Sequence, residues 1–137
     1  MDEAAPEHVE ALTALGLRTD QFPTFLRGEI VVYAPPTEGQ PGVAVLQKTS
    51  TRLRSGIVEI ADPGGGGART FLRFRGRSQR IAALFGLAEL ELFGAAVVNA
   101  RLEQVLLSRG FVRRTGACPD QLGGGEMEIL TRVFPLS

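Results

Sequence analysis

The residues best suited to chemistry in this sequence lie in one short run, Arg75-Gly76-Arg77-Ser78-Gln79-Arg80. The run separates an alternating segment, Thr70–Arg75, from a helix expected over Ser78–Leu87. A turn that opens a helix exposes backbone N–H groups, and the helix dipole adds positive potential there. Arginine side chains add bidentate donors. The run is therefore predicted to bind an anion such as phosphate, and an arginine-rich solvated face is the alternative.

Other reactive side chains are few. The chain has one histidine, His8, and one cysteine, Cys118, so a disulfide within the chain, a cysteine-rich zinc site and a serine–histidine triad are not expected. Glu89 and Glu91 would share one face of a strand, but no Asp and Lys accompany them at suitable positions. We interpret that pair as an ordinary strand entry, and we expect no metal site.

The composition fits one small domain. The chain has 137 residues, of which 44% are apolar, and 15 basic residues balance 15 acidic ones. No apolar stretch approaches the roughly 20 residues that cross a bilayer, and the acidic start lacks an apolar signal region. These features predict a soluble cytoplasmic domain without a membrane partner. Residues 51–115 carry eleven bases and five acids, so an anionic ligand is expected there.

The first half of the chain predicts a helix followed by a hairpin. A helix is expected over residues 4–15, because Val9, Leu12 and Leu15 form an apolar stripe that Gly16 can end. Short β-type runs follow, of which the first two form a hairpin: Glu29–Ala34, Val43–Gln47 and Ile57–Ala61. The glycine-rich segment Asp62–Gly67 is interpreted as a surface loop.

The second half alternates strands and helices. A strand over Thr70–Arg75, the helix over Ser78–Leu87 and a buried strand over Leu90–Val98 are expected in turn. Asn99 can cap a helix over 100–109, which Gly110 ends. Two final strands are expected at Phe111–Thr115 and Glu126–Phe134. The order predicts an α+β domain with a mixed, mostly antiparallel sheet flanked by helices.

Roughly residues 55–137 resemble the GNAT-type N-acetyltransferase superfamily. The run Arg75–Arg80 stands for the family's arginine- and glycine-containing loop after its fourth strand, and Leu90–Val98 for its splayed fifth strand. The helix from Asn99 to Gly110-Phe111 has the family's Asn-to-Gly-Phe spacing. The resemblance implies one GNAT-like domain over residues 1–137, with a helix and hairpin over 1–50 and a cofactor-binding half over 55–137.

The same resemblance implies acetyl-CoA as cofactor and a set of binding residues. The binding residues would be Arg75, Gly76, Arg77, Ser78, Gln79, Arg80 and Asn99. Glu59 is the candidate base, acting through a water molecule. The chain departs from the family where Ser78 and Arg80 replace loop glycines, and where Leu106 stands at the position of a proton-donating tyrosine.

The function implied is transfer of an acetyl group from acetyl-CoA to a primary amine on a small molecule or a protein. Such chemistry depends mainly on positioning, so it needs neither histidine nor metal. The alternative is a non-catalytic module of the same fold, including a bacterial-type effector or toxin module, which uses its arginine-rich face against an anionic partner such as RNA. Homodimer formation is left open.

Overall fold

The computed structural model describes residues 5–34, 42–59, 67–95 and 100–136; the side chains of 59, 67–72, 95 and 100–102 are not part of the description. The chain begins with α1 (Pro6–Leu15), a 3-10 turn η1 (Thr19–Gln21) and α2 (Phe22–Leu26). The helix predicted at residues 4–15 is confirmed, with Gly16 at a φ of 124° directly after it. The short α2 was not predicted.

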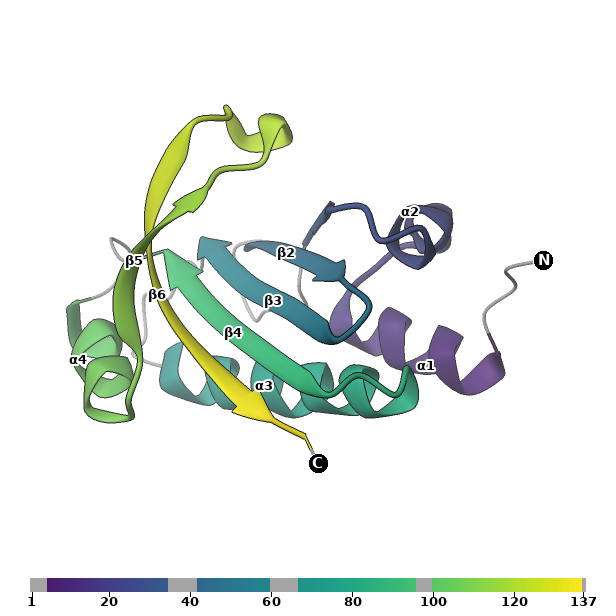
Figure 1. The fold of residues 1–137 in the computed structure, drawn as a ribbon, viewed down its shortest axis with the longest axis horizontal. Helices are drawn as coiled ribbons and strands as arrows, with labels where there is room; N and C mark the ends of the chain where they lie inside the picture. Colours follow the sequence, from purple (N-terminus) through teal and green to yellow (C-terminus); the bar gives the residue numbers. More distant parts are fainter. Residues whose placement is uncertain (1–4, 35–41, 60–66, 96–99, 137) are drawn as a thin grey trace.

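A six-stranded sheet forms the centre of the molecule (Figure 1). Its strands are β1 (Val31–Tyr33), β2 (Val43–Lys48), β3 (Arg52–Glu59), β4 (Glu89–Ala95), β5 (Val112–Ala117) and β6 (Glu126–Pro135). Their order across the sheet is β1-β2-β3-β4-β6-β5, and only β3 and β4 pair in parallel. The predicted α+β class with a mixed, mostly antiparallel sheet is therefore confirmed.

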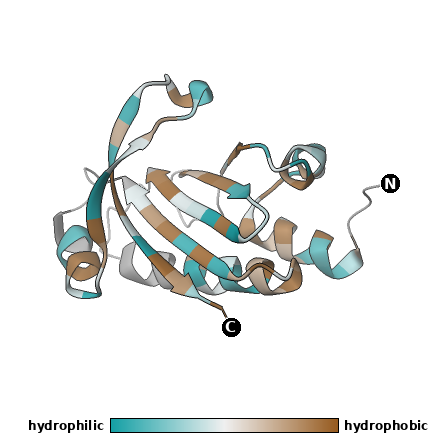
Figure 2. Ribbon diagram, viewed as in Figure 1, coloured by the Kyte–Doolittle hydropathy of each residue, from teal (hydrophilic) through white to brown (hydrophobic). Residues whose placement is uncertain are grey.

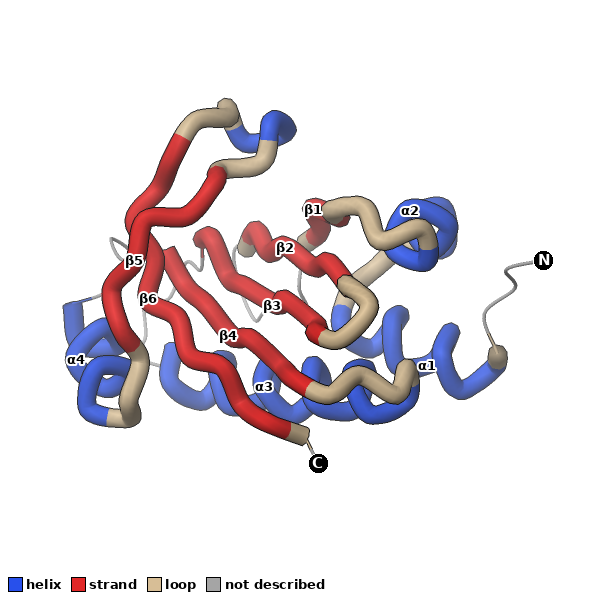
Figure 3. Tube along the Cα trace, viewed as in Figure 1, coloured by secondary structure: helices blue, strands red, loops and turns tan. Residues whose placement is uncertain are grey.

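Two further helices connect the strands (Figure 3). The long helix α3 (Gly67–Leu84) joins β3 to β4, and α4 (Ala100–Ser108) joins β4 to β5. A second 3-10 turn, η2 (Asp120–Leu122), lies between β5 and β6. Among the described residues, no helix combines the length and the apolar character needed to cross a bilayer.

The helices cover one face of the sheet, where the main core lies. Strand residues alternate between the two faces, and this alternation is visible as bands along β3 and β4 (Figure 2). The helix-covered face is the more apolar, and its fully buried residues come from α1, α2 and α3 as well as from the strands: Leu12, Leu15, Phe25, Leu46, Leu53, Ile81, Leu90, Leu92 and Leu130.

The other face, called the open face here, carries a second and smaller apolar cluster of Val45, Phe93 and Ile129. No α-helix contributes to this cluster in the part of the chain that is described. The ring of Phe93 lies over Gly56, where an added Cβ would come within 2.0 Å of a ring carbon. Gly56 is therefore the residue that allows the aromatic ring to lie flat against β3.

The strand predicted over Thr70–Arg75 is wrong, because these residues belong to α3. The alternation that suggested a strand covers only six residues. A helical period continues much further, and it places Phe74, Ser78, Ile81 and Ala82 on the buried face of α3. The helix predicted to begin at Ser78 is thus the second half of a longer one.

Gly76 tests this assignment. It lies in the interior of α3, and an added Cβ would meet no atom within 4 Å. We expect Gly76→Ala to raise the free energy of unfolding by about 0.5–1 kcal/mol, because alanine loses less backbone freedom in a helix. Urea denaturation measures the change.

Gly56→Ala is the matched comparison. Here the new methyl group would collide with the Phe93 ring, so the free energy of unfolding should fall by about 1–3 kcal/mol. A Gly76→Ala variant with a lower free energy of unfolding would contradict the helix assignment. An increase for Gly76→Ala together with a decrease for Gly56→Ala would support it.

Candidate functional site

The two parallel strands separate at their carboxyl ends. Pairing between β3 and β4 runs from Arg52 opposite Glu89 to Ile57 opposite Gly94. Beyond that point β3 continues in pairing with β2 as far as Glu59, and β4 continues in pairing with β6 as far as Ala95. Each strand therefore stays in the sheet through its outer neighbour, while the inner edges no longer pair with one another.

An irregularity in β3 accompanies this separation. Ala44 lies opposite Ile57, whereas Val43 lies opposite Glu59, so Val58 is an extra residue with no partner in β2. A bulge of this kind bends a strand and redirects the groups beside it. Backbone N–H and C=O groups of β3 beyond Ile57 consequently face a place where a ligand could pair with them.

Both helices that follow the parallel strands begin at this same end of the sheet (Figure 1). The helix α3 starts at Gly67 after β3, and α4 starts at Ala100 after β4. The first N–H groups of a helix have no acceptor within it, and they favour anions. In open sheets with parallel strands, ligands bind outside the carboxyl ends of those strands.

The predicted phosphate-binding turn at Arg75–Arg80 is not a turn. All six residues lie at least eight positions inside α3, where backbone N–H groups donate to carbonyls one turn earlier. They cannot form a cradle of free amides. In the sequence, α3 is preceded instead by the glycine-rich segment Asp62–Gly67, which was interpreted as a surface loop, and residues 60–66 lie outside the described part of the chain.

The side chains of this run have other partners. Ser78 is fully buried, and its hydroxyl lies 2.8 Å from that of Ser55 on β3, so the predicted contact with a cofactor is wrong for Ser78. The Arg75 guanidinium lies 4.3 Å from the centre of the Phe134 ring, and Arg80 donates to Glu10 of α1 at 3.3 Å. Contacts of Arg77 and Gln79 with an anion stay a prediction.

The remaining predicted site residues have mixed outcomes. Glu59 is the last residue of β3, and its role as a base stays a prediction because its side chain is not described. Asn99 lies outside the described residues, although α4 begins directly after it. Leu106 is 4% exposed and packs in the main core, so this position of α4 supplies no proton donor. The strand over Leu90–Val98 is confirmed as β4 as far as Ala95.

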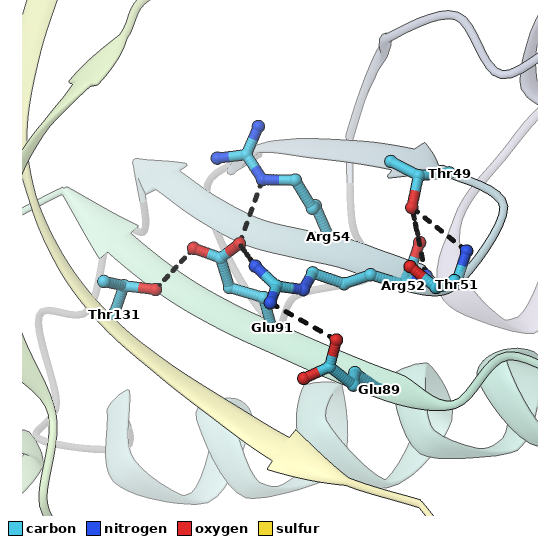
Figure 4. Close-up of polar contacts among 7 residues, drawn as sticks. All are labelled: Thr49, Thr51, Arg52, Arg54, Glu89, Glu91 and Thr131. Carbon is cyan, nitrogen blue, oxygen red and sulfur yellow. Dashed lines mark hydrogen bonds and ion pairs between the residues drawn. The ribbon is translucent and has the colours of Figure 1, made fainter.

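A polar cluster on the open face was missed by the sequence analysis (Figure 4). Arg52 and Arg54 of β3 face Glu89 and Glu91 of β4. Arg54 Nε donates to Glu91 Oε1 at 3.1 Å, and Arg52 donates to both glutamates at 3.3 Å. In the sequence, two arginines and two glutamates each recur at every second position. Only the parallel register of β3 and β4 shows that these two pairs are neighbours.

Glu91 is the centre of this cluster. It is 8% exposed, and its second oxygen accepts a hydrogen bond of 2.7 Å from Thr131 of β6. Burial alone would raise the pKa of Glu91, but the Thr131 hydrogen bond and the charges of Arg54 and Arg52 outweigh burial and lower it. Glu91 therefore stays charged, and it ties three adjacent strands together.

The cluster does not form a metal site. In the described ranges, no group of three His, Cys, Asp or Glu side chains gathers as metal ligands would. Glu89 and Glu91 are held by arginines instead. The interpretation of Glu89 and Glu91 as an ordinary strand entry is too narrow, because they join β3 and β4 through these ion pairs.

Comparison with known proteins gives structural matches only. No protein-family model matches the sequence, and no curated protein matches it significantly. A probable acetyltransferase has 15% identity and a TM-score of 0.48, with 85% of this chain and 68% of that chain covered. RimJ from Mycobacterium smegmatis, in complex with CoA-disulfide, has 16% identity and the same TM-score of 0.48, with 85% of this chain and 58% of that chain covered.

A further match is an acetyltransferase from Bacillus subtilis in complex with CoA. It has 17% identity and a TM-score of 0.41, with 100% of this chain and 96% of that chain covered.

The chain's own topology agrees with what the resemblance implies. A long helix connects a parallel pair that separates at one end, a shorter helix follows, and an antiparallel pair closes the sheet. The fold is α+β, with the order of elements that the resemblance to GNAT-type acetyltransferases implies. In this chain the separated ends of β3 and β4, together with the first turns of α3 and α4, form the candidate site.

The charge of Glu91 gives a testable pH dependence. Because its folded-state pKa lies below the ordinary value, its contribution to stability is present above pH of about 4.3 and is lost as the pH falls through the folded-state pKa. We expect Glu91→Gln to lower the free energy of unfolding by about 1–3 kcal/mol at pH 7. The difference from the unmodified protein should narrow at pH 3, as measured by urea denaturation at both values.

The exposed residue Glu126, on the end of β6, serves as the control, because Glu126→Gln should change stability by no more than about 0.5 kcal/mol at either pH. If Glu91→Gln lowers the free energy of unfolding equally at pH 7 and pH 3, the charge of Glu91 does not contribute to stability.

Proposed function

We propose that this chain binds acetyl-CoA at the separated carboxyl ends of β3 and β4 and transfers the acetyl group to a primary amine. The observation that carries the proposal is the end of β3–β4 pairing at Ile57 and Gly94 while both strands continue. The pantetheine arm of acetyl-CoA contains amide groups, which can pair with an open strand edge as another strand would.

The diphosphate has a complementary place at the same end. The described part of α3 begins at Gly67, and the first turn of a helix offers N–H groups without an acceptor inside the helix and the positive end of the helix dipole. In the sequence, three further glycines directly precede Gly67: Gly64, Gly65 and Gly66. Glycine permits a close approach of backbone to phosphate because no Cβ intervenes.

Acetyl-CoA supplies a reactive thioester, so the chain's part in the reaction is mainly to position it. Backbone groups of Val58 and Glu59 lie where β3 has lost its partner strand, and an N–H there would polarise the carbonyl under attack. Holding the amine and the carbonyl in contact removes much of the entropic barrier. The carboxylate of Glu59, acting through water, is the proposed acceptor of the proton from the amine.

Titration calorimetry with acetyl-CoA and with CoA tests this proposal. Both should bind, and Gly67→Val should weaken binding at least tenfold, because a branched side chain would enter the first turn of α3. Gly76→Ala is the matched control, since Gly76 lies two to three turns further along the same helix and should leave binding unchanged.

Release of free thiol from acetyl-CoA in the presence of primary amines is the second measurement. If neither acetyl-CoA nor CoA binds to the protein, the proposal is overturned. If Gly76→Ala loses acetyl-CoA binding and Gly67→Val keeps it, the phosphate site lies in the middle of α3, not at its first turn.

A second candidate function follows from the helical spacing of arginines. Arg73, Arg77 and Arg80 lie at i, i+4 and i+7 on α3, so they form one stripe. A polyanion such as RNA would contact the whole stripe, and its affinity would fall steeply with salt as counterions are released. A gel shift at low and moderate salt beside the acetyl-CoA titration separates the two functions.

A further inference from the structure

The open face of the sheet contains a shallow pocket beside the polar cluster. Its lining comes from β2, β3 and β4, from Ile30 before β1, and from the far end of the β5–β6 hairpin. The pocket is small and open to solvent on one side, so a ligand larger than a water molecule would lie partly outside it. The lining is mostly apolar, with one cationic side chain, Arg54, and one side-chain amide, Gln47.

Arg54, the single charged residue of the lining, is held in a fixed orientation. Its Nε donates to Glu91 at 3.1 Å, and its guanidinium carbon lies 5.3 Å from the centre of the Phe93 ring. Both oxygens of Glu91 are already engaged, since Arg52 shares the first and Thr131 donates to the second. The carboxylate of Glu91 and the ring of Phe93 together leave the side chain of Arg54 little rotational freedom.

The two terminal nitrogens of Arg54 have no partner among the described residues. They point away from Glu91 (Figure 4), and among the described residues neither of them makes a hydrogen bond or an ion pair. Gln47, the other polar residue of the lining, donates its side-chain amide to the Gly28 carbonyl at 3.1 Å. A guanidinium with both terminal nitrogens free matches the two oxygens of a carboxylate.

The position of Arg54 relates the pocket to the candidate site. Phe93 is in register with Gly56, so the guanidinium above this ring lies about two residues, or roughly 7 Å, before the bulge at Val58. That distance is similar to the length of a small amino acid. One molecule could therefore contact Arg54 while its amine reaches the separated ends of β3 and β4.

We propose that this pocket binds a small apolar amine that also carries a carboxylate, with the carboxylate on the terminal nitrogens of Arg54. Amino acids with an apolar side chain are the substrate class that fits. The apolar group would lie against Val45, Met127 and Ile129. Its role as the acceptor of an acetyl group rests on the proposed function. Its binding in the pocket does not depend on acetyl-CoA.

Binding of four amino acids, compared with their amides, tests this inference in the absence of acetyl-CoA. The probes are valine, leucine, methionine and phenylalanine, and each amide keeps the amine and the side chain but lacks the carboxylate. We expect ligand-observed NMR titration to show that at least one acid binds tenfold or more tightly than its amide. Arg54→Lys should remove most of that difference, because a lysine lacks the two-pronged donor.

Two further variants separate a binding role from a structural one. Ala117→Leu should fill the pocket from the hairpin without touching the polar cluster, and it should weaken the acid at least tenfold while the melting temperature stays unchanged. Arg18→Lys is the matched control, because Arg18 is exposed and pairs only with Asp20 among the described residues. It should leave all affinities unchanged.

The outcomes distinguish this inference from the proposed function. Preference for the acids without release of thiol from acetyl-CoA would support the pocket and contradict acetyl transfer. Equal transfer to the acids and their amides would support acetyl transfer and overturn the inference. Equal binding of all four pairs, or an Arg54→Lys variant that keeps the full preference for acids, would also overturn it.

Discussion

A parallel pair of strands inside an otherwise antiparallel sheet imposes one constraint on the rest of this molecule. The chain leaves β3 at its carboxyl end and must return to the opposite end of the sheet before β4 can begin. The eighteen residues of α3 make this return, which places a long helix against the sheet and its first turn beside the end of β3. The core, the position of the helix start and the candidate site all follow from that crossover.

The same pair is secured differently on its two faces. Toward the helices, Leu53 and Leu90 are fully buried, and Ser55 meets Ser78 of α3. On the open face, no α-helix supplies apolar cover in the described part of the chain, and Glu91 of β4 joins the strands through Arg54 of β3 and Thr131 of β6. The pair is thus tied at its beginning by ion pairs and left free at its end, which is where a ligand would need access.

The sequence predicts the fold class and most of the elements, because long apolar periods and terminating glycines are local signals. The helix before Gly16, the hairpin and the last two strands are confirmed with shifts of a few residues at their ends. The assignment of Arg75–Arg80 to a turn is wrong because the alternation up to Arg75 masked a helical period that becomes visible only over a longer window.

The contacts on the open face beside the candidate site were harder to predict for a different reason. The partners of Arg52 and Arg54 are 37 to 39 residues away along the chain, and only the register of the parallel pair brings them together. Likewise, neither Gly56 nor Phe93 indicates alone that one lies against the other. The resemblance to a family assigned anion binding to Arg75–Arg80, and the structure places these residues in the interior of α3.

The contact between Gly56 and Phe93 has a consequence for how this sequence can evolve. The ring occupies the space of any side chain at position 56, and it also supports the guanidinium of Arg54. A larger residue at 56 is tolerable only after position 93 has become smaller, and that change would in turn release Arg54. In related sequences the three positions should therefore vary as a group, and a chain that has lost the aromatic ring should show a relaxed choice of residue at 54.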